Sequence, residues 1–201
     1  MAKKPHPAPG QGETVRREIV EAANRLFYHR GYNQTSFTDI AEAAGIPRGN
    51  FYYYFRSKDD ILGAVIDARI ERIRAMLAEW DAAEPDPRLR LKRFAQMIRG
   101  SEKDLLRYGC PMGSLNIELG KAQPALKARA KKMFDLFIDW LARQLAALGQ
   151  ADASRLALQA MGRVQGVAVM TQVYGDREFM RAQLAEFDAW IESLPAQGPA
   201  K

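Results

Sequence analysis

Cysteine and histidine are scarce in this chain of 201 residues. The one cysteine, Cys110, excludes an intrachain disulfide and indicates a reducing compartment, so we expect a cytoplasmic protein. The two histidines, His6 and His29, lie in different segments, and the sequence holds no metal-ligand cluster, glycine-rich phosphate loop or nucleophile–base pair. We therefore expect no enzymatic activity, no bound metal and no cofactor.

Long apolar runs are also missing. No run approaches the ~18–20 residues that span a bilayer, and residues 1–11 are polar and proline-rich, unlike a signal peptide. We therefore expect no contact with a membrane. With 47% apolar residues and a mean hydropathy of −0.33, the chain can still bury a sizeable core.

Charge of one sign is not concentrated in any part of the chain. The net charge is +6 and the isoelectric point is near 9.5, which permits a nucleic-acid partner. Residues 1–60 hold 9 Lys and Arg against 7 Asp and Glu. Binding of nucleic acid would therefore depend on where individual charges lie, and not on a strongly basic domain.

Apolar residues recur every three or four positions along most of the chain, and no segment alternates as a strand would. The sequence predicts an all-α fold of about nine helices. These cover 14–30, 36–44, 47–54, 58–80, 88–107, 112–120, 124–148, 153–174 and 176–194. We expect a flexible arm at 1–12, a first domain at 13–58, a second helical domain at 59–194 and a disordered tail at 195–201.

Two short helical segments around Gly45 are the most informative part of the sequence. Ser36 precedes Asp39 by three positions, the spacing of a capping box that begins a helix. Gly45 suits the positive φ that ends this helix, and Pro47 suits the first position of the next. Two short helices joined by a glycine turn are typical of the helix-turn-helix that reads DNA.

The second of these helices carries side chains that can contact DNA. Arg48 can bond guanine bidentately, and Asn50 can bond a base edge or a phosphate. The alternative is that the aromatic residues pack inside, as we expect for Phe51 and Phe55, but three consecutive tyrosines cannot all be buried. The predicted DNA-binding residues, on base edges or on phosphates, are Ser36, Thr38, Arg48, Asn50, Tyr52, Tyr53 and Lys58.

The segments Asp39–Gly45 and Gly49–Lys58 resemble the DNA-binding signature of the TetR family of bacterial repressors. Thr38 and Tyr54 depart from the basic residue and the histidine that many members carry there, which leaves the preferred base sequence open. The resemblance implies a homodimer, paired through its last two helices, on a double-stranded DNA operator. It also implies a cavity for a small-molecule effector in the second domain.

Several residues of the last two helices fit the implied dimer. Gly162 and Gly166 would let another helix approach closely, although such glycines also serve ordinary packing within one chain. With a partner present, four apolar residues of the final helix would lie in the interface instead of being exposed: Leu184, Phe187, Trp190 and Ile191.

The segment Gly109–Gly120 is similar to one with a Gly-Cys-x-x-Gly pattern in a branch of the family, some of whose members sense thiol-reactive compounds. Cys110 would then be a sensor, which needs access and a nearby positive charge such as Arg107. The alternative is an inert, buried cysteine. Methionine and phenylalanine suit an adaptable pocket, although most such residues are core. The candidate effector-binding or sensing residues are Cys110, Met112, Asn116, Met133, Phe137 and Gln165.

These features predict a ligand-responsive transcriptional repressor that binds a palindromic operator as a dimer. A small molecule or a thiol-reactive compound would release it. The alternative is a DNA-binding protein without an effector. The helix at 58–80 is the only long element that leaves the first domain, so we expect it to carry the signal, with the helix at 112–120 pressing on its far end.

Overall fold

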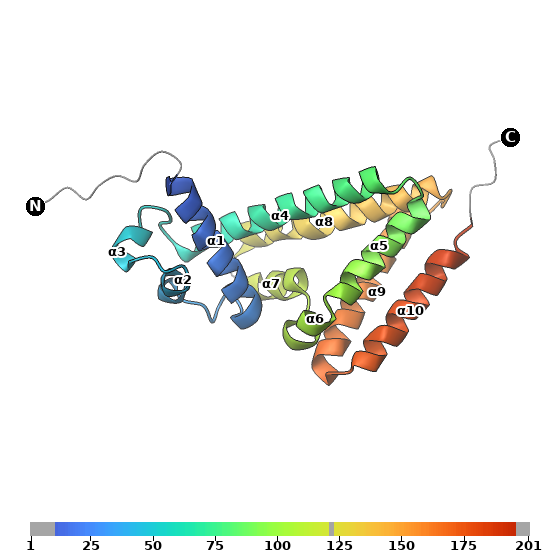
Figure 1. The fold of residues 1–201 in the computed structure, drawn as a ribbon. Helices are drawn as coiled ribbons and strands as arrows, with labels where there is room; N and C mark the ends of the chain where they lie inside the picture. The colour runs from blue at the N-terminus through green and yellow to red at the C-terminus, as the bar shows by residue number, and fades with distance from the viewer. Residues whose placement is uncertain (1–10, 121–122, 196–201) are drawn as a thin grey trace, which may run out of the picture. The chain divides into compact units, whose positions relative to one another are not determined.

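The computed structural model describes residues 11–120 and 123–195. These residues form ten helices and no strand, which confirms the predicted all-α class (Figure 1). None of the described helices is both long and apolar enough to cross a membrane. The predicted arm at 1–12 lies outside the described residues except for its last two positions, and so does the predicted tail beyond 195. The helices are α1 (Gln11–Arg30), α2 (Phe37–Ala43), α3 (Arg48–Phe51), α4 (Lys58–Ala83), α5 (Pro87–Gly100), α6 (Glu102–Tyr108), α7 (Pro111–Leu119), α8 (Pro124–Ala147), α9 (Ala153–Tyr174) and α10 (Arg177–Ser193).

The described residues divide into two compact units. The first unit contains the chain up to Arg69 together with Leu115–Arg129. The second contains Ile70–Ser114 and the chain from Ala130. Helices α4, α7 and α8 therefore each have residues in both units. The division differs from the predicted boundary between 58 and 59, because the end of α7 and the start of α8 belong to the unit that holds the helix-turn-helix.

Two helix boundaries differ from the prediction. α1 begins at Gln11, three positions before the predicted cap, Thr14. The segment predicted as one helix over 88–107 divides at Ser101 into α5 and α6. Gly100 is a poor helix former, and the Ser101 hydroxyl donates to the Met97 carbonyl at 3.1 Å, which satisfies one of the last carbonyls of α5. This division accounts for the tenth helix.

The first unit has a small apolar core between α1, the helix-turn-helix and the beginning of α4. Its members are spaced by three and four positions along α1 and α4, as an amphipathic helix requires. The fully buried side chains of this core are Ile19, Ala23, Ile40, Phe51, Ile61, Leu62, Val65 and Ile66.

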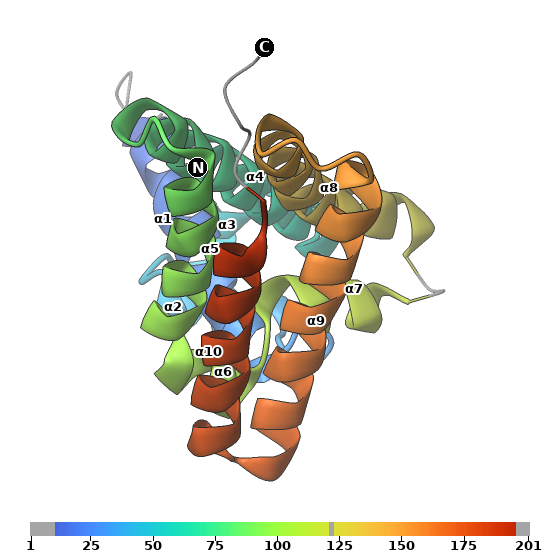
Figure 2. The same cartoon turned by 90° about the vertical axis from the view of Figure 1, so that its right-hand side faces the viewer.

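The second unit is built around long helices, of which α10 lies side by side with both α5 and α9 (Figure 2). Its core includes Leu184, Phe187 and Ile191, which are 1%, 2% and 0% exposed. The predicted placement of these three residues in a dimer interface is therefore wrong. The periodicity of α10 correctly marks them as buried, but they are buried against their own chain. Trp190 is half-buried and lies against Phe187, with ring centroids 5.3 Å apart.

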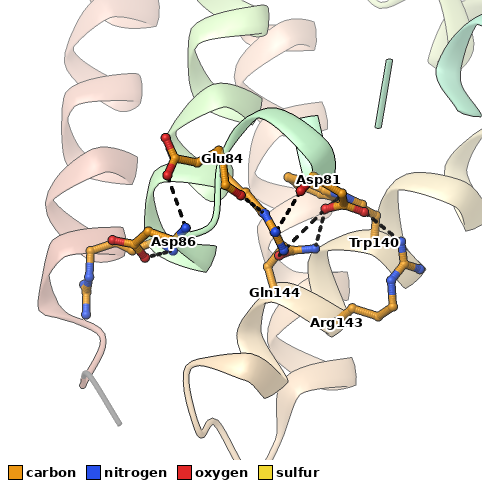
Figure 3. Close-up of polar contacts among 8 residues, drawn as sticks. Asp81, Glu84, Asp86, Trp140, Arg143 and Gln144 are labelled. Atoms are coloured by element: carbon orange, nitrogen blue, oxygen red, sulfur yellow. Dashed lines mark hydrogen bonds and ion pairs between the residues drawn. The ribbon is translucent and has the colours of Figure 1, made fainter. Parts of the chain in front are cut away.

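A polar network holds the end of α4 to α5 and α8 within the second unit (Figure 3). The Asp81 carboxylate accepts hydrogen bonds from Trp140 Nε1 at 2.9 Å and from Gln144 Nε2 at 3.3 Å. Arg90 donates to the Asp81 carbonyl at 2.9 Å, to Gln144 Oε1 at 3.2 Å and to the Glu84 carbonyl. Because each buried polar group has a partner, the end of α4 is fixed in position.

Arg88, in the first turn of α5, caps the end of α10. Its guanidinium donates to the Ile191 carbonyl, to the Glu192 carbonyl at 2.9 Å and to the Leu194 carbonyl. The last carbonyls of a helix have no partner within the helix, so this arginine satisfies groups that would otherwise need water.

Candidate nucleic-acid interface

The beginning of α2 has the predicted capping box. Ser36 Oγ accepts from the Asp39 N–H at 3.1 Å, and the Ser36 N–H donates to Asp39 Oδ2 at 2.7 Å. Hydrogen bonding of the Asp39 carboxyl by Ser36, first by its side chain and then by its backbone N–H, lowers the pKa of this carboxyl, with a smaller contribution from Arg30. Two polar side chains thus fix where α2 begins and in which direction it points.

The turn after α2 also follows the prediction in part. Gly45 has a φ of +67°, and the Ile46 N–H donates to the Ala41 carbonyl at 3.0 Å. The second helix is shorter than expected, since α3 contains only Arg48–Phe51 and the tyrosines lie in the turn that follows. Pro47 is the N-cap residue of α3 instead of its first helical residue.

The aromatic residues around α3 separate into buried and exposed sets. Phe51 and Phe55 are 0% and 3% exposed, as predicted, whereas Tyr52 and Tyr53 are 59% and 74% exposed. The Tyr52 ring stacks on Phe37 of α2, with centroids 5.0 Å apart and planes at 25°. This contact orients one of the two exposed tyrosines relative to α2.

The other predicted DNA-binding residues lie in the same unit. Ser36 is exposed at the cap of α2, and Thr38, in the first turn of α2, is half-buried. Arg48 begins α3, and the half-buried Asn50 lies within it. The structure therefore places Ser36, Thr38, Asn50, Tyr52 and Tyr53, none of them buried, in α2, its cap, α3 and the turn after α3.

Lys58 contacts the loop between α1 and α2. Its ammonium donates to the backbone carbonyls of Tyr32 at 2.9 Å and Thr35 at 3.0 Å, and lies 4.2 Å from the centroid of the Tyr32 ring. Two of its three donor protons are used on the loop between α1 and α2. The structure thus makes Lys58 a residue that holds this loop, and its contact with a phosphate stays a prediction.

Two residues near this loop were missed by the sequence analysis. The Glu118 carboxylate of α7 accepts from the N–H groups of Tyr32 at 2.8 Å and Asn33 at 3.2 Å. The Tyr32 hydroxyl donates to Asp59 at the beginning of α4. Burial, and then the Asp59 carboxylate, raise the pKa of the Tyr32 phenol above its ordinary value. Only the glycine before Tyr32 signalled a special backbone here, and nothing in the sequence pointed to Glu118.

The segment after α7 reaches the beginning of α4, not its far end. Gln123 Nε2 donates to Asp59 Oδ2 at 3.0 Å. Gln123 lies beyond the helix at 112–120, so the expectation that this helix presses on the far end of α4 stays a prediction. The contacts of this segment are with the part of α4 next to the helix-turn-helix.

The candidate effector residues are not gathered in one place. Met133 and Phe137 of α8 are 0% and 2% exposed, and Phe137 packs on Phe94 in the core with centroids 5.6 Å apart. Asn116 belongs to the first unit, whereas the other five candidates belong to the second. Met112 is partly buried against the core of the second unit.

Cys110 and Gln165 do come together, on either side of Gly113. The Gly113 N–H donates to Cys110 Sγ at 3.4 Å. A Cβ added to Gly113 would lie 2.8 Å from Gln165 Oε1 and 3.8 Å from Cys110 Sγ. Cys110 is thus half-buried directly before α7, and its thiol and the Gln165 amide both lie near Gly113.

An N-terminal helix-turn-helix that exposes polar and aromatic side chains, joined to a larger bundle of apolar helices, defines a DNA-binding transcriptional regulator. Two family descriptions match the chain. Bacterial regulatory proteins of the tetR family match residues 19–65, and the C-terminal domain of LmrA/YxaF-like transcriptional regulators matches residues 89–186.

Individual relatives agree with these matches. An uncharacterized HTH-type transcriptional regulator in the lacX 3′ region of Lactococcus lactis subsp. lactis is 30% identical over 136 residues, 67% of this chain and 69% of that protein. The HTH-type transcriptional regulator TtgR of Pseudomonas putida is 27% identical over 193 residues, 91% of this chain and 90% of that protein. A TetR transcriptional regulator from Legionella pneumophila, 25% identical, has a crystal structure that matches with a TM-score of 0.78 over 94% of this chain and 99% of that one. The chain belongs to the TetR family of transcriptional regulators.

Proposed function

We propose that this TetR-family protein is a homodimeric repressor that binds a near-palindromic operator and releases it in response to a small molecule. One recognition helix contacts too few base pairs for specificity, so two are needed in successive turns of the major groove. The observation that carries the proposal is an exposed apolar stripe on α9, which a second chain would cover.

The stripe follows α9 at helical spacing. Its large members Leu158, Val169 and Val173 are 61%, 48% and 68% exposed. Gly162 and Gly166 lie between them, and apart from neighbouring residues of α9 itself no atom of the described chain is within 4 Å of where their Cβ atoms would be. A monomer rarely leaves a contiguous apolar face of this kind in water, which favours burial by a partner.

α10 has an outer face of small residues. Ala182, Ala185 and Ala189 are exposed at spacings of three and four. Arg163 and Glu186 pair across α9 and α10 at 2.7 Å, which places this face next to the stripe. Small side chains let helix backbones approach closely, so the outer faces of α9 and α10 from two chains can pack as a four-helix bundle.

Sedimentation of two glutamate variants tests the dimer. Val173→Glu places a charge in the stripe and should raise the dimer dissociation constant by roughly tenfold or more, because an unpaired charge resists burial. Leu89→Glu is the matched control, since Leu89 of α5 is also exposed, at 41%. A wild-type monomer at micromolar concentration, or the same shift in both variants, would count against the proposed interface.

On the DNA side, the proposed contacts are those of α2, α3 and the turn that follows α3. Base edges are assigned to Arg48 and Asn50, because these side-chain types can bond bases bidentately. Phosphates are assigned to Ser36, Thr38, Tyr52 and Tyr53. Selection of DNA from a random-sequence pool with the full chain tests this assignment. Arg48→Ala should relax the preference at one position of each half-site, whereas Tyr53→Phe should weaken all sequences about equally.

For the response, we propose that the second unit contains the effector-sensitive element and that Cys110 is part of it. The half-buried thiol, the adjacent N–H of Gly113 and the amide of Gln165 support this. Cys110→Ser should bind the selected DNA within about twofold of wild type but lose any response to N-ethylmaleimide. If the serine variant responds like wild type, the thiol is a packing residue. If no compound releases either protein, the alternative of a regulator without an effector is favoured.

A further inference from the structure

The loop between α1 and α2 holds a carboxylate from a distant helix. Glu118 of α7 lies 85 and 86 positions from the two residues whose N–H groups it accepts. Its two oxygens are divided between them, Oε2 on Tyr32 and Oε1 on Asn33. Glu118 is thus bonded to successive backbone amides in a bidentate arrangement.

Gly31 is what makes room for this carboxylate. Its φ is +89°, and a Cβ at this position would lie 2.8 Å from Glu118 Oε1. Successive N–H groups that follow a residue with positive φ form a concave backbone site that favours an anion. The loop therefore has the backbone conformation of an anion-binding nest, and the side chain of Glu118 fills it.

Side chains also donate hydrogen bonds to the backbone carbonyls of the same loop. Lys58 donates to the carbonyls of Tyr32 and Thr35, and the Thr35 hydroxyl donates to the Gly31 carbonyl at 2.7 Å. Ser36, the cap of α2, follows directly. A displacement of this loop therefore moves the beginning of α2, which carries two of the residues assigned to phosphate contact.

We infer that Glu118 is a positioning residue for DNA binding: its carboxylate in the Gly31–Asn33 nest sets the α1–α2 loop, and its withdrawal weakens operator binding. The inference rests on the proposed function. α7 begins at Pro111, directly after the candidate sensing residue Cys110, and carries Glu118 in its last turn. A shift or rotation of α7 changes the fit of Glu118 in the nest without any residue of α7 touching DNA.

Three variants of α7 test the inference in the full chain. DNA selected by the wild-type protein from a random pool serves as the probe. Glu118→Ala and Glu118→Gln should both weaken binding by about five- to tenfold, because a neutral amide cannot supply two acceptor oxygens. Ile117→Ala is the matched control, since this neighbouring side chain is 76% exposed, and its affinity should equal that of wild type.

The salt dependence of DNA binding distinguishes a positioning residue from a residue that contacts DNA directly. Because Glu118 does not replace a counterion on DNA, the slope of log affinity against log salt should be the same in Glu118→Ala and wild type. In ¹H–¹⁵N spectra of the full chain, the amide signals of Tyr32 and Asn33 should move in the alanine variant. Formate at millimolar concentration should move them back and restore part of the lost affinity by occupying the nest.

Each outcome decides one question. If wild type selects no DNA, the proposed function fails, whatever Glu118 does. If wild type binds but Glu118→Ala matches Ile117→Ala, the positioning role is wrong. If Glu118→Gln binds like wild type while Glu118→Ala does not, the side chain acts by packing alone, which also overturns the inference.

Discussion

The two units of this chain hold their helices in place by different means. In the first unit, α2 and α3 have only seven and four residues, and a short-range polar capping box fixes the beginning of α2. In the second unit, α5, α8, α9 and α10 have 14 to 24 residues and bury continuous apolar faces. Short helices are marginal without external support, whereas long amphipathic helices gain most of their stability from packing.

Because of this difference, we expect substitutions to have different effects in the two units. Loss of a core side chain in the second unit should lower the free energy of unfolding without changing the DNA-reading surface. Loss of a polar contact in the first unit should cost less stability but displace the residues that face DNA. Three substitutions of decreasing expected effect on stability test this contrast.

The largest effect is expected at Trp140. This side chain is fully buried, packs edge to face on Trp80 and donates to Asp81. Trp140→Ala should lower the free energy of unfolding by about 3–5 kcal/mol, because it leaves a cavity and removes a hydrogen-bond donor from the half-buried Asp81 carboxylate. Urea unfolding measures this change in the free energy of unfolding. Trp190→Ala, which truncates a half-buried tryptophan, is the control. A change of less than 1 kcal/mol at Trp140 would contradict the packing described.

An intermediate effect is expected at Lys58. Lys58→Ala removes two charge-assisted hydrogen bonds to backbone carbonyls, and should lower the free energy of unfolding by about 1.5–3 kcal/mol. It should also weaken DNA binding while leaving its salt slope unchanged, since the ammonium is used within the loop. Arg56→Ala, which removes an exposed charge two positions away, is the control and should leave stability nearly unaltered. A flatter salt slope for Lys58→Ala would instead support the phosphate contact.

Lys58 also shows why only part of the site could be predicted. The capping box of Ser36 and Asp39 and the turn at Gly45 depend on residues within a few positions of one another, so the sequence pattern contains the whole interaction. The partners of Lys58 lie 23 and 26 positions away, and those of Glu118 lie 85 and 86 away. No local pattern records such contacts.

Prediction of the fold from local patterns was limited in the same way. Helical periodicity predicted the all-α class and correctly marked Leu184, Phe187 and Ile191 as residues to be buried. Periodicity does not state which surface buries them, and these three face their own core. The stripe at Leu158, Val169 and Val173 became visible only when the structure showed which side of α9 its own chain leaves open.

The smallest of the three effects is expected at Ser36. Ser36→Ala removes the side-chain acceptor of the capping box and should cost about 0.5–2 kcal/mol, expressed as faster amide exchange in α2. Ser154→Ala, at an exposed serine of α9, is the control and should change nothing.

The capping box also predicts a dependence on pH. The folded state lowers the pKa of Asp39, so the carboxylate contributes stability above its unfolded pKa, near ~4, and this contribution is lost as the pH falls through the lower folded value. Because the Ser36 side chain is the main cause of that lowered pKa, Ser36→Ala should reduce the loss of protection in α2 between about pH 5 and pH 3. An unchanged acid profile would mean that the Ser36 backbone N–H alone holds the carboxylate.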